Sequence, residues 1–303
     1  MKTITGRRQD LEAIEVNAPE SYIGGMVYPV VNVMEKTGSI YYTTLTADSA
    51  AQTGRSAGAA PTKTLLAESV TTFSCAEAIK RYGVPKAEVK QMGGIEKADR
   101  LGGIASKRSV CRAIETAQAA AAFDGTSYAA AADISSAIID GIINAAQDNK
   151  RYGGRQAFVT SVTGYRWLIQ QTEIKNLLLR TFGGLDPVQA MSLQPEVFKA
   201  MLQGIFQFEE VLIGDDDHWA IATQEDAAMI VKLPDADEFS HKLDPVLGKT
   251  ALYLPDGMQP FEVESFYDED TKTNNYDATS WYQVKELNTS AKQVVKGLGT
   301  PTT

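Results

Sequence analysis

The fold of this chain is decided by the stretch SIYYTTLTADSAAQTGRSAGAAPTKTLLAESVTTF, which occupies residues Ser39–Phe73. Its two ends, Ser39–Thr46 and Thr62–Phe73, are rich in Thr, Val, Tyr and Leu, residues that favour β-strands. The segment between them, Ala47–Pro61, contains no Val, Ile, Leu, Met or aromatic residue, and small polar residues cannot bury enough apolar area to offset their ordering entropy. Two interpretations of this stretch stay open: a β-arm that becomes ordered on another surface, or a mobile surface loop.

The composition is that of a soluble globular protein, because 44% of the 303 residues are hydrophobic and 22% are charged. No apolar run approaches the roughly 18 residues that a transmembrane helix needs. The first residues, MKTITGRRQDLEAIEV, lack the apolar core of a signal peptide, so neither export nor a membrane is expected. The two cysteines, Cys75 and Cys111, make no disulfide framework and no metal cluster.

The net charge is 29 − 38 = −9. Much of it lies in Asp215–Asp244, a range that contains nine acidic residues and only two lysines. No run of consecutive basic residues is longer than two, as at Lys107-Arg108. Nucleic-acid readers usually carry a basic stripe, so sequence-specific DNA recognition is not expected. This charge suits a shell that encloses DNA without adhering to it, and it suits a soluble enzyme equally well.

Around the central stretch, the first third of the chain shows few periodic patterns. Residues 1–26 carry no clear element and are expected to form an N-terminal arm that is ordered only against a neighbour. Ser74 and Glu77 have the spacing of a helix capping box, which predicts a helix over residues 76–82. A long helix is expected from Ile95 or Ile104 to Phe123, with Val110, Ile114, Ala117 and Ala121 on one stripe.

From Asp133 the pattern alternates between helices and strands, which predicts an α/β domain with a central sheet. The last third reads as strands that alternate apolar and polar residues, with a polar link before the last long one. The helices are expected at 133–151, 163–171 and 195–206, and the strands at 27–33, 156–161, 208–213, 227–233, 250–254, 261–267, 281–287 and 293–295.

A search for catalytic chemistry finds none. Gly248-Lys249-Thr250 lacks the first glycine of a phosphate-binding loop and precedes a strand rather than a helix. His218 follows three aspartates, so a metal site is conceivable, but a solvated acidic turn is the preferred interpretation. Cys111 lies among apolar positions and is expected to be a small buried hydrophobe rather than a nucleophile. No catalytic residue, cofactor or metal is therefore predicted, and the chain is not expected to be an enzyme.

The order of these parts resembles the major capsid protein of tailed bacteriophages, with the Hong Kong 97-type fold. The resemblance is greatest in DPVLGKTALYLPDGMQPFEVESFYDED (residues 244–270) and WYQVKEL (residues 281–287), which look like the paired strands that end such chains. It implies an α+β fold with five segments. These are an N-terminal arm and first strand (1–34), an extended loop or β-arm (35–73), a peripheral domain with a long spine helix (74–129), an axial domain (130–244) and returning strands (245–303).

The resemblance also implies a function: self-assembly into hexamers and pentamers of an icosahedral head that encloses double-stranded DNA, without sequence-specific binding. The chain would belong to the virion and assemble in the host cytoplasm. A separate scaffolding protein is expected, because no scaffolding segment fits before the β-arm, and a portal and decoration proteins are further expected partners. The extended-loop tip would contact neighbouring subunits, and Lys36 and Lys63 occupy the region in which some members form crosslinks. The tip residues singled out are Gly54, Arg55, Ala57, Gly58 and Lys63.

Two other interpretations remain. An encapsulin-type nanocompartment shell protein would keep the fold and hold protein cargo instead of DNA. A cytosolic α/β enzyme with the β-arm as a lid would belong to another class, and the scarcity of histidine and the missing motifs argue against it.

Overall fold

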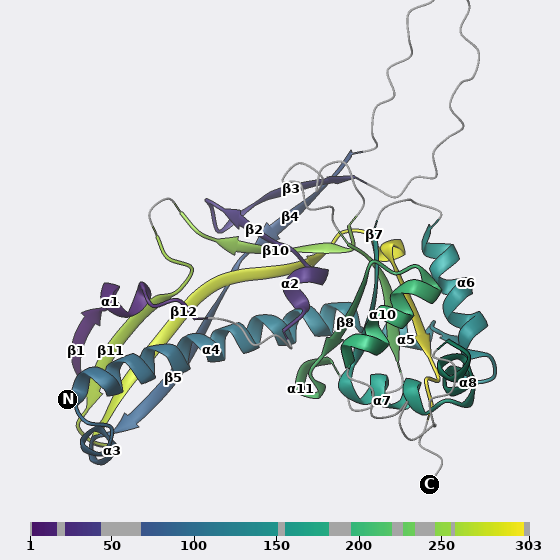
Figure 1. Cartoon of the computed structure of the whole chain (residues 1–303). Helices are drawn as coiled ribbons and strands as arrows, with labels where there is room; N and C mark the ends of the chain where they lie inside the picture. Colours follow the sequence, from purple (N-terminus) through teal and green to yellow (C-terminus); the bar gives the residue numbers. More distant parts are fainter. Residues whose placement is uncertain are drawn as a thin grey trace, which may run out of the picture. The chain divides into compact units, whose positions relative to one another are not determined.

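The computed structural model describes residues 2–16, 22–43, 68–150, 155–181, 195–219, 227–233, 246–255 and 258–299 (Figure 1). The chain divides into two compact units. Both combine helices with β-sheet, which confirms the predicted α+β class. The boundaries of the five predicted segments stay predictions. Unit 1 comprises Met1–Ser39, Thr72–Gln118 and Lys249–Lys285, and unit 2 comprises Ile40–Thr71, Ala119–Gly248 and Glu286–Thr303.

Unit 1 is built on a six-stranded sheet that joins residues far apart in the sequence. The central strand is β12, whose residues Thr273–Thr279 pair with β11 along one edge and with β5 along the other. β1 continues the sheet beyond β11, and β2 pairs in parallel with β10. The strands are β1 (Lys2–Arg7), β2 (Val30–Val33), β5 (Ala76–Pro85), β10 (Gly248–Tyr253), β11 (Glu262–Asp268) and β12 (Thr273–Glu286).

Helix α4 (Ile95–Ala122) is the predicted long helix. Its residues Ala98 and Val110 belong to one buried cluster with Tyr276 of the sheet. Gly102 allows this close packing, because a Cβ at that position would lie 2.1 Å from Cδ2 of the Tyr276 ring. Glycine costs a helix about 1 kcal/mol relative to alanine, and the tight contact with the ring offsets that cost. The other helices of unit 1 are α1 (Gln9–Glu12), α2 (Gly24–Val27) and α3 (Lys86–Gln91).

Residues 2–16 are built into unit 1, so the prediction that residues 1–26 hold no element and are ordered only by a neighbour is wrong. β1 pairs with β11, and Leu11 is 3% exposed. The ammonium group of Lys107 donates to the carbonyl oxygens of Leu11, Glu12 and Ile14 at 2.7–2.8 Å. This order comes from long-range pairing and from one buried charge, which local periodicity does not reveal.

The helix predicted over residues 76–82 is also wrong, because this segment is part of the strand β5. β5 makes ten consecutive pairs with β12, from Ala76↔Tyr282 to Pro85↔Thr273. The pairing outweighs the local capping signal of Ser74 and Glu77, since helix propensity is a weak prior that tertiary contacts override.

β12 is much longer than the strand predicted at 281–287. It takes in residues 273–277, which belong to the polar tract that was predicted to be a link. Two flanking strands satisfy the backbone of this segment, so polar side chains such as Asn274 do not prevent it from forming a strand. The strands predicted at 250–254 and 261–267 are confirmed as β10 and β11.

Unit 2 contains a five-stranded sheet in the order β6-β13-β9-β7-β8. Most of the alternating elements predicted after Asp133 are confirmed, but the helix predicted to start there begins at Ile138 instead. Asp133 lies in β6, where its Oδ1 accepts a hydrogen bond from the N–H of Ser135 at 3.0 Å. The strands are β6 (Ala132–Asp133), β7 (Arg155–Ser161), β8 (Glu210–Gly214), β9 (Ala228–Leu233) and β13 (Lys292–Lys296).

The helices of unit 2 pack on this sheet around one hydrophobic core. Ile138 and Ile142 of α6 meet Phe158 of β7, Leu168 of α7 and Ile230 of β9 there. All five side chains are at most 2% exposed, which explains why their periodicity was readable in the sequence. The helices are α5 (Gly125–Ala129), α6 (Ile138–Lys150), α7 (Val162–Gln170), α8 (Thr172–Thr181), α10 (Pro195–Phe206) and α11 (Asp216–Trp219).

Candidate assembly surfaces

The β-arm begins as a two-stranded sheet of β3 (Thr37–Thr43) and β4 (Glu68–Ser74). This confirms the predicted strands over Ser39–Thr43 and Glu68–Phe73, and the rest of the two predicted ends lies outside the described residues. Tyr41 and Val70 are 58% and 55% exposed, so the root of the arm presents apolar side chains that the described residues leave uncovered. Such exposure on a thin hairpin favours contact with another surface.

The base of the arm is fastened to unit 1. The N–H of Ser74 donates to Oε1 of Gln283 at 2.7 Å, and the N–H of Cys75 donates to the carbonyl oxygen of Lys36 at 2.7 Å. Nζ of Lys36 lies 4.0 Å from the ring centroid of Trp281, a cation–π distance. These contacts fix the root from which the arm leaves the sheet.

β5 offers a second candidate surface, because β12 is the one strand that pairs with it among the described residues. Its other edge therefore carries a row of backbone N–H and C=O groups that no described strand covers. Nine of its ten residues are exposed or half-buried, including Ile79 at 52% and Tyr82 at 39%. A long edge strand with exposed apolar residues is a template for pairing with another chain.

The groups considered for catalysis do not form a reactive site. His218 is only 8% exposed, and its ring Nδ1 contacts Asp215, so the prediction of a solvated acidic turn is wrong. Burial raises the pKa of the thiols of Cys75 and Cys111, which disfavours the reactive thiolate. Within the described ranges, no group of three or more His, Cys, Asp or Glu side chains is arranged to hold a metal ion.

Gly248-Lys249-Thr250 is also accounted for structurally. These residues open β10, and Thr250 pairs with Val30 of β2. The hydroxyl of Thr250 accepts a hydrogen bond from Nε2 of Gln118 at 2.8 Å. Lys249 and Thr250 are buried in a strand, whereas a phosphate-binding loop leads into a helix.

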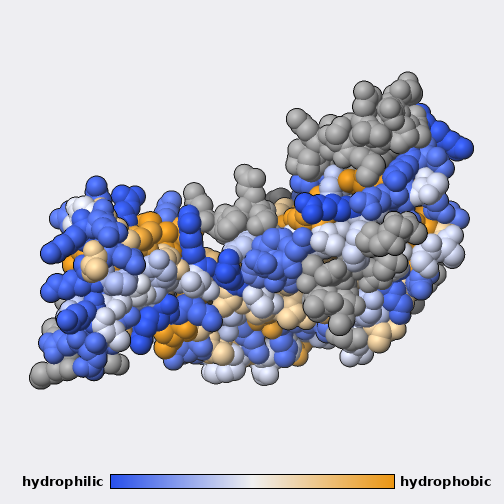
Figure 2. Space-filling view, turned by 90° about the horizontal axis from the view of Figure 1, so that it is seen from below, coloured by the Kyte–Doolittle hydropathy of each residue, from blue (hydrophilic) through white to orange (hydrophobic). Residues whose placement is uncertain are grey.

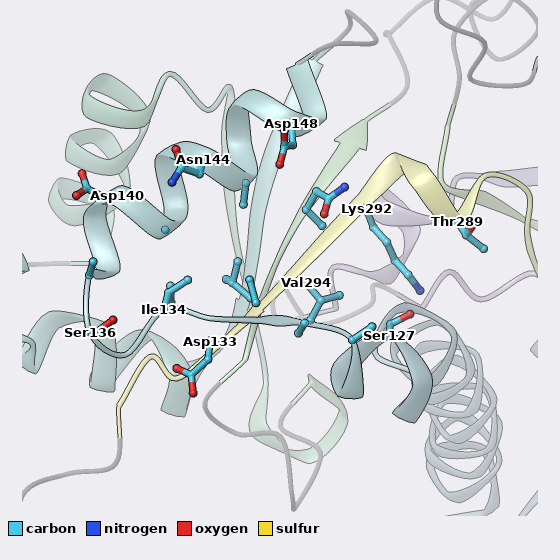
Figure 3. A pocket seen from close by; sticks show the side chains of 18 residues that line it. Ser127, Asp133, Ile134, Ser136, Asp140, Asn144, Asp148, Thr289, Lys292 and Val294 are labelled. Atoms are coloured by element: carbon cyan, nitrogen blue, oxygen red, sulfur yellow. The ribbon is translucent and has the colours of Figure 1, made fainter.

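Unit 2 contains an open cavity of about 520 Å³ between α5, β6, α6 and β13 (Figure 3). Asp140, Asn144 and Asp148 line it from α6, and Lys292 lies on the opposite side. Nζ of Lys292 is already engaged by the carbonyl oxygens of Ala121 and Ala122 at 3.3 and 3.1 Å. The ammonium group of Lys292 is therefore already used inside the subunit, at the carbonyl end of α4.

Comparison with solved structures identifies the fold across the whole chain. A phage-related protein of Bordetella bronchiseptica RB50 is 16% identical, with a TM-score of 0.65 and 99% of both chains covered. The capsid of cyanophage P-SCSP1u is 11% identical, with a TM-score of 0.54 over 98% of this chain and 92% of that one. The fold is the Hong Kong 97-type capsid fold. A Microbacterium phage Oxtober96 structure is 11% identical with a TM-score of 0.55, covering 93% of this chain and 92% of that one.

No family model and no curated protein matches the sequence. The comparison of structures confirms the Hong Kong 97-type fold that the order of parts in the sequence predicted. The predicted contact residues of the extended-loop tip lie outside the described residues and stay predictions: Gly54, Arg55, Ala57, Gly58 and Lys63. Among the described residues, none of the helices is both long and apolar enough to cross a membrane. The exposed edge of β5 was missed, because its segment was predicted to be a helix.

Proposed function

We propose that the chain is a structural shell subunit, the major capsid protein of a tailed phage. Copies of it would assemble into hexamers and pentamers of an icosahedral head that encloses double-stranded DNA. Its partners would be a separate scaffolding protein, a portal and decoration proteins. The protein would be located in the virion.

The observation that carries this proposal is the agreement of fold over nearly the entire chain with a cyanophage capsid structure. The match to the phage-related protein covers 99% of both chains, which supports a single fold for the whole chain. The anchored β-arm and the uncovered edge of β5 add surfaces that a single copy leaves unsatisfied. Subunits that spread weak contacts over several neighbours can close a stable shell.

The test is to express the whole chain and a variant that lacks Asp48–Ala60, and to image both by negative-stain electron microscopy. The expected result is rings, sheets or closed shells from the whole chain. The deletion variant, which keeps β3 and β4, is expected to give soluble subunits and no closed shells, because the arm can no longer reach its neighbour.

Circular dichroism and thermal unfolding of the deletion variant serve as the folding control. Normal particles from the folded deletion variant would refute the role of the arm. A whole chain that stays monomeric even with the proteins encoded beside it would refute the shell. Nucleic acid inside native particles is expected, and protein cargo instead of it would contradict a phage head.

A further inference from the structure

Helix α4 carries a row of basic side chains along the side that does not pack on the sheet. Lys97, Arg100, Arg108 and Arg112 are all exposed, although the chain as a whole carries a net charge of −9. They are three, eight and four residues apart, and on a helix of 3.6 residues per turn these spacings place them on one side. The opposite side buries Ala98, Ser106 and Val110.

The acidic side chains of α4 do not neutralise this row. Asp99 is held by Nη1 of Arg8 at 3.0 Å and by the hydroxyl of Tyr276. Oε1 of Glu115 is buried and accepts the backbone N–H groups of Ile23 and Gly24 at 2.8 and 3.0 Å. Glu96 is therefore the one exposed acid of the helix, against four exposed basic residues.

Three of the basic residues are also without an ion pair in the part of the chain that the structure describes: Lys97, Arg100 and Arg108. Elsewhere in unit 1, exposed arginines are matched by carboxylates. Arg81 contacts Asp277 at 2.6 Å, and Arg7 contacts Glu12 at 2.8 Å. Three exposed basic side chains that no carboxylate of the described residues matches point to an anionic partner outside the subunit.

We infer that the exposed side of α4 is a binding surface for the phosphate backbone of double-stranded DNA, and that this side faces the interior of the shell. The inference rests on the proposed function. From Lys97 to Arg108 the helix rises about 16 Å at 1.5 Å per residue, which exceeds the roughly 12 Å width of the major groove. Basic side chains at the two ends can thus reach phosphates on both strands.

The nature of the surface favours DNA over an acidic protein. A protein partner would be expected to bury an apolar patch, whereas the large exposed hydrophobic residues on α4 are the isolated Ile95 and Leu101. In the view of Figure 2, hydrophilic residues predominate and hydrophobic residues form small separate patches. Contacts of this kind recognise charge and not sequence, so they agree with the absence of a sequence-reading motif.

The experiment measures binding of unassembled full-length chain to a fluorescent 30-base-pair duplex as a function of salt concentration. Binding at low salt should weaken with a log–log slope of about −0.9 for each phosphate contact. The variant Lys97→Gln/Arg100→Gln/Arg108→Gln should reduce the magnitude of that slope by about 2.7. A matched variant with the same loss of charge elsewhere in unit 1, Lys80→Gln/Lys272→Gln/Lys285→Gln, should leave the slope unchanged.

The inference is overturned if the duplex does not bind at low salt, if both triple variants lose the same slope, or if poly-glutamate binds more tightly than the duplex. It is also overturned if electron cryomicroscopy of assembled shells places α4 on the outer surface. Shell formation is scored separately by negative stain. If the chain forms shells but does not bind DNA, only this inference is refuted. If the chain binds DNA but never assembles, the proposed function is refuted.

Discussion

Two lysines, Lys107 and Lys292, are 1% and 6% exposed, and both direct their ammonium groups at oxygen atoms. Lys292 lies at the carbonyl end of α4, with Glu286 Oε1 at 3.0 Å and Asp124 Oδ2 at 3.5 Å. The N–H of Ser127, together with Lys292, holds the pKa of Asp124 below its usual range. A cation at this position satisfies carbonyl groups that the helix cannot bond itself and complements the helix dipole.

Replacing Lys292 with methionine should therefore destabilise the protein by about 2–3 kcal/mol, because it leaves helix carbonyls and a largely buried carboxylate without their cation. The urea midpoint followed by tryptophan fluorescence measures the loss. Lys296→Met is the matched control, since Lys296 lies on the same strand and its contacts are weaker, at 3.5 Å to the carbonyl oxygen of Ala129 and 5.4 Å to the ring centroid of Tyr128. Equal shifts for the two variants would contradict the assigned role.

At the scale of elements, Lys107 of α4 helps to hold β1 and α1 in unit 1. Lys107 binds the carbonyl groups of Leu11, Glu12 and Ile14 at and just after the end of α1, where a short helix has no internal partners for them. Arg7 adds two hydrogen bonds to the carboxylate of Glu12, at 2.8 and 3.1 Å. The N-terminal segment is thus held by a few charged contacts as well as by its strand pairing.

The variant Lys107→Met should loosen this segment selectively. Loss of a charged donor to backbone oxygens is worth about 1.5–3 kcal/mol, so hydrogen exchange in residues 2–16 should accelerate about tenfold or more. Hydrogen exchange with mass spectrometry reads the segment directly, and Lys90→Met on α3 is an exposed control. If exchange in β1 were unchanged, strand pairing alone would hold the segment.

At the scale of the whole molecule, the elements that the sequence predicted are those with a local apolar pattern. The elements that it did not predict depend on partners far away in the sequence. The helices α4, α7 and α10 bury their own periodic faces, and β7 and β9 are short apolar runs buried along nearly their whole length, so the sequence pattern was sufficient to find them. β5, the first half of β12 and residues 2–7 are strands because of partners that lie up to 266 positions away. Local propensity carries no record of such partners.

The candidate surfaces divide in the same way. The strands β3 and β4 at the root of the predicted β-arm were foreseen from two Thr-rich segments, and the arm itself stays a prediction. The basic side of α4 was missed, because the sequence was searched for consecutive basic residues, whereas Lys97, Arg100 and Arg108 come together only through the helical repeat. The buried roles of Lys107 and Lys292 depend on tertiary contacts and leave no local signal.

The uncovered edge of β5 leads to a prediction about assembly. If a neighbouring copy pairs with this edge, Ile79→Lys should strongly reduce closed shells, because a charge on an edge strand opposes further pairing. Ile79 is 52% exposed, so the free energy of unfolding should change by less than about 0.5 kcal/mol. Ile79→Val is the matched control and should assemble normally. The measurement is the yield of closed particles, counted by negative-stain electron microscopy. A normal yield from Ile79→Lys would exclude β5 from the contact between neighbouring copies.

The position of β13 has a consequence for synthesis. This strand lies inside the sheet of unit 2, between β6 and β9, yet it is formed by residues 292–296. β12, which joins β5 to β11 in unit 1, is likewise made late. A nascent chain on the ribosome therefore cannot complete either sheet until nearly all of the sequence has been translated. Premature stop codons before β13 would therefore yield chains with incomplete sheets, which proteases clear.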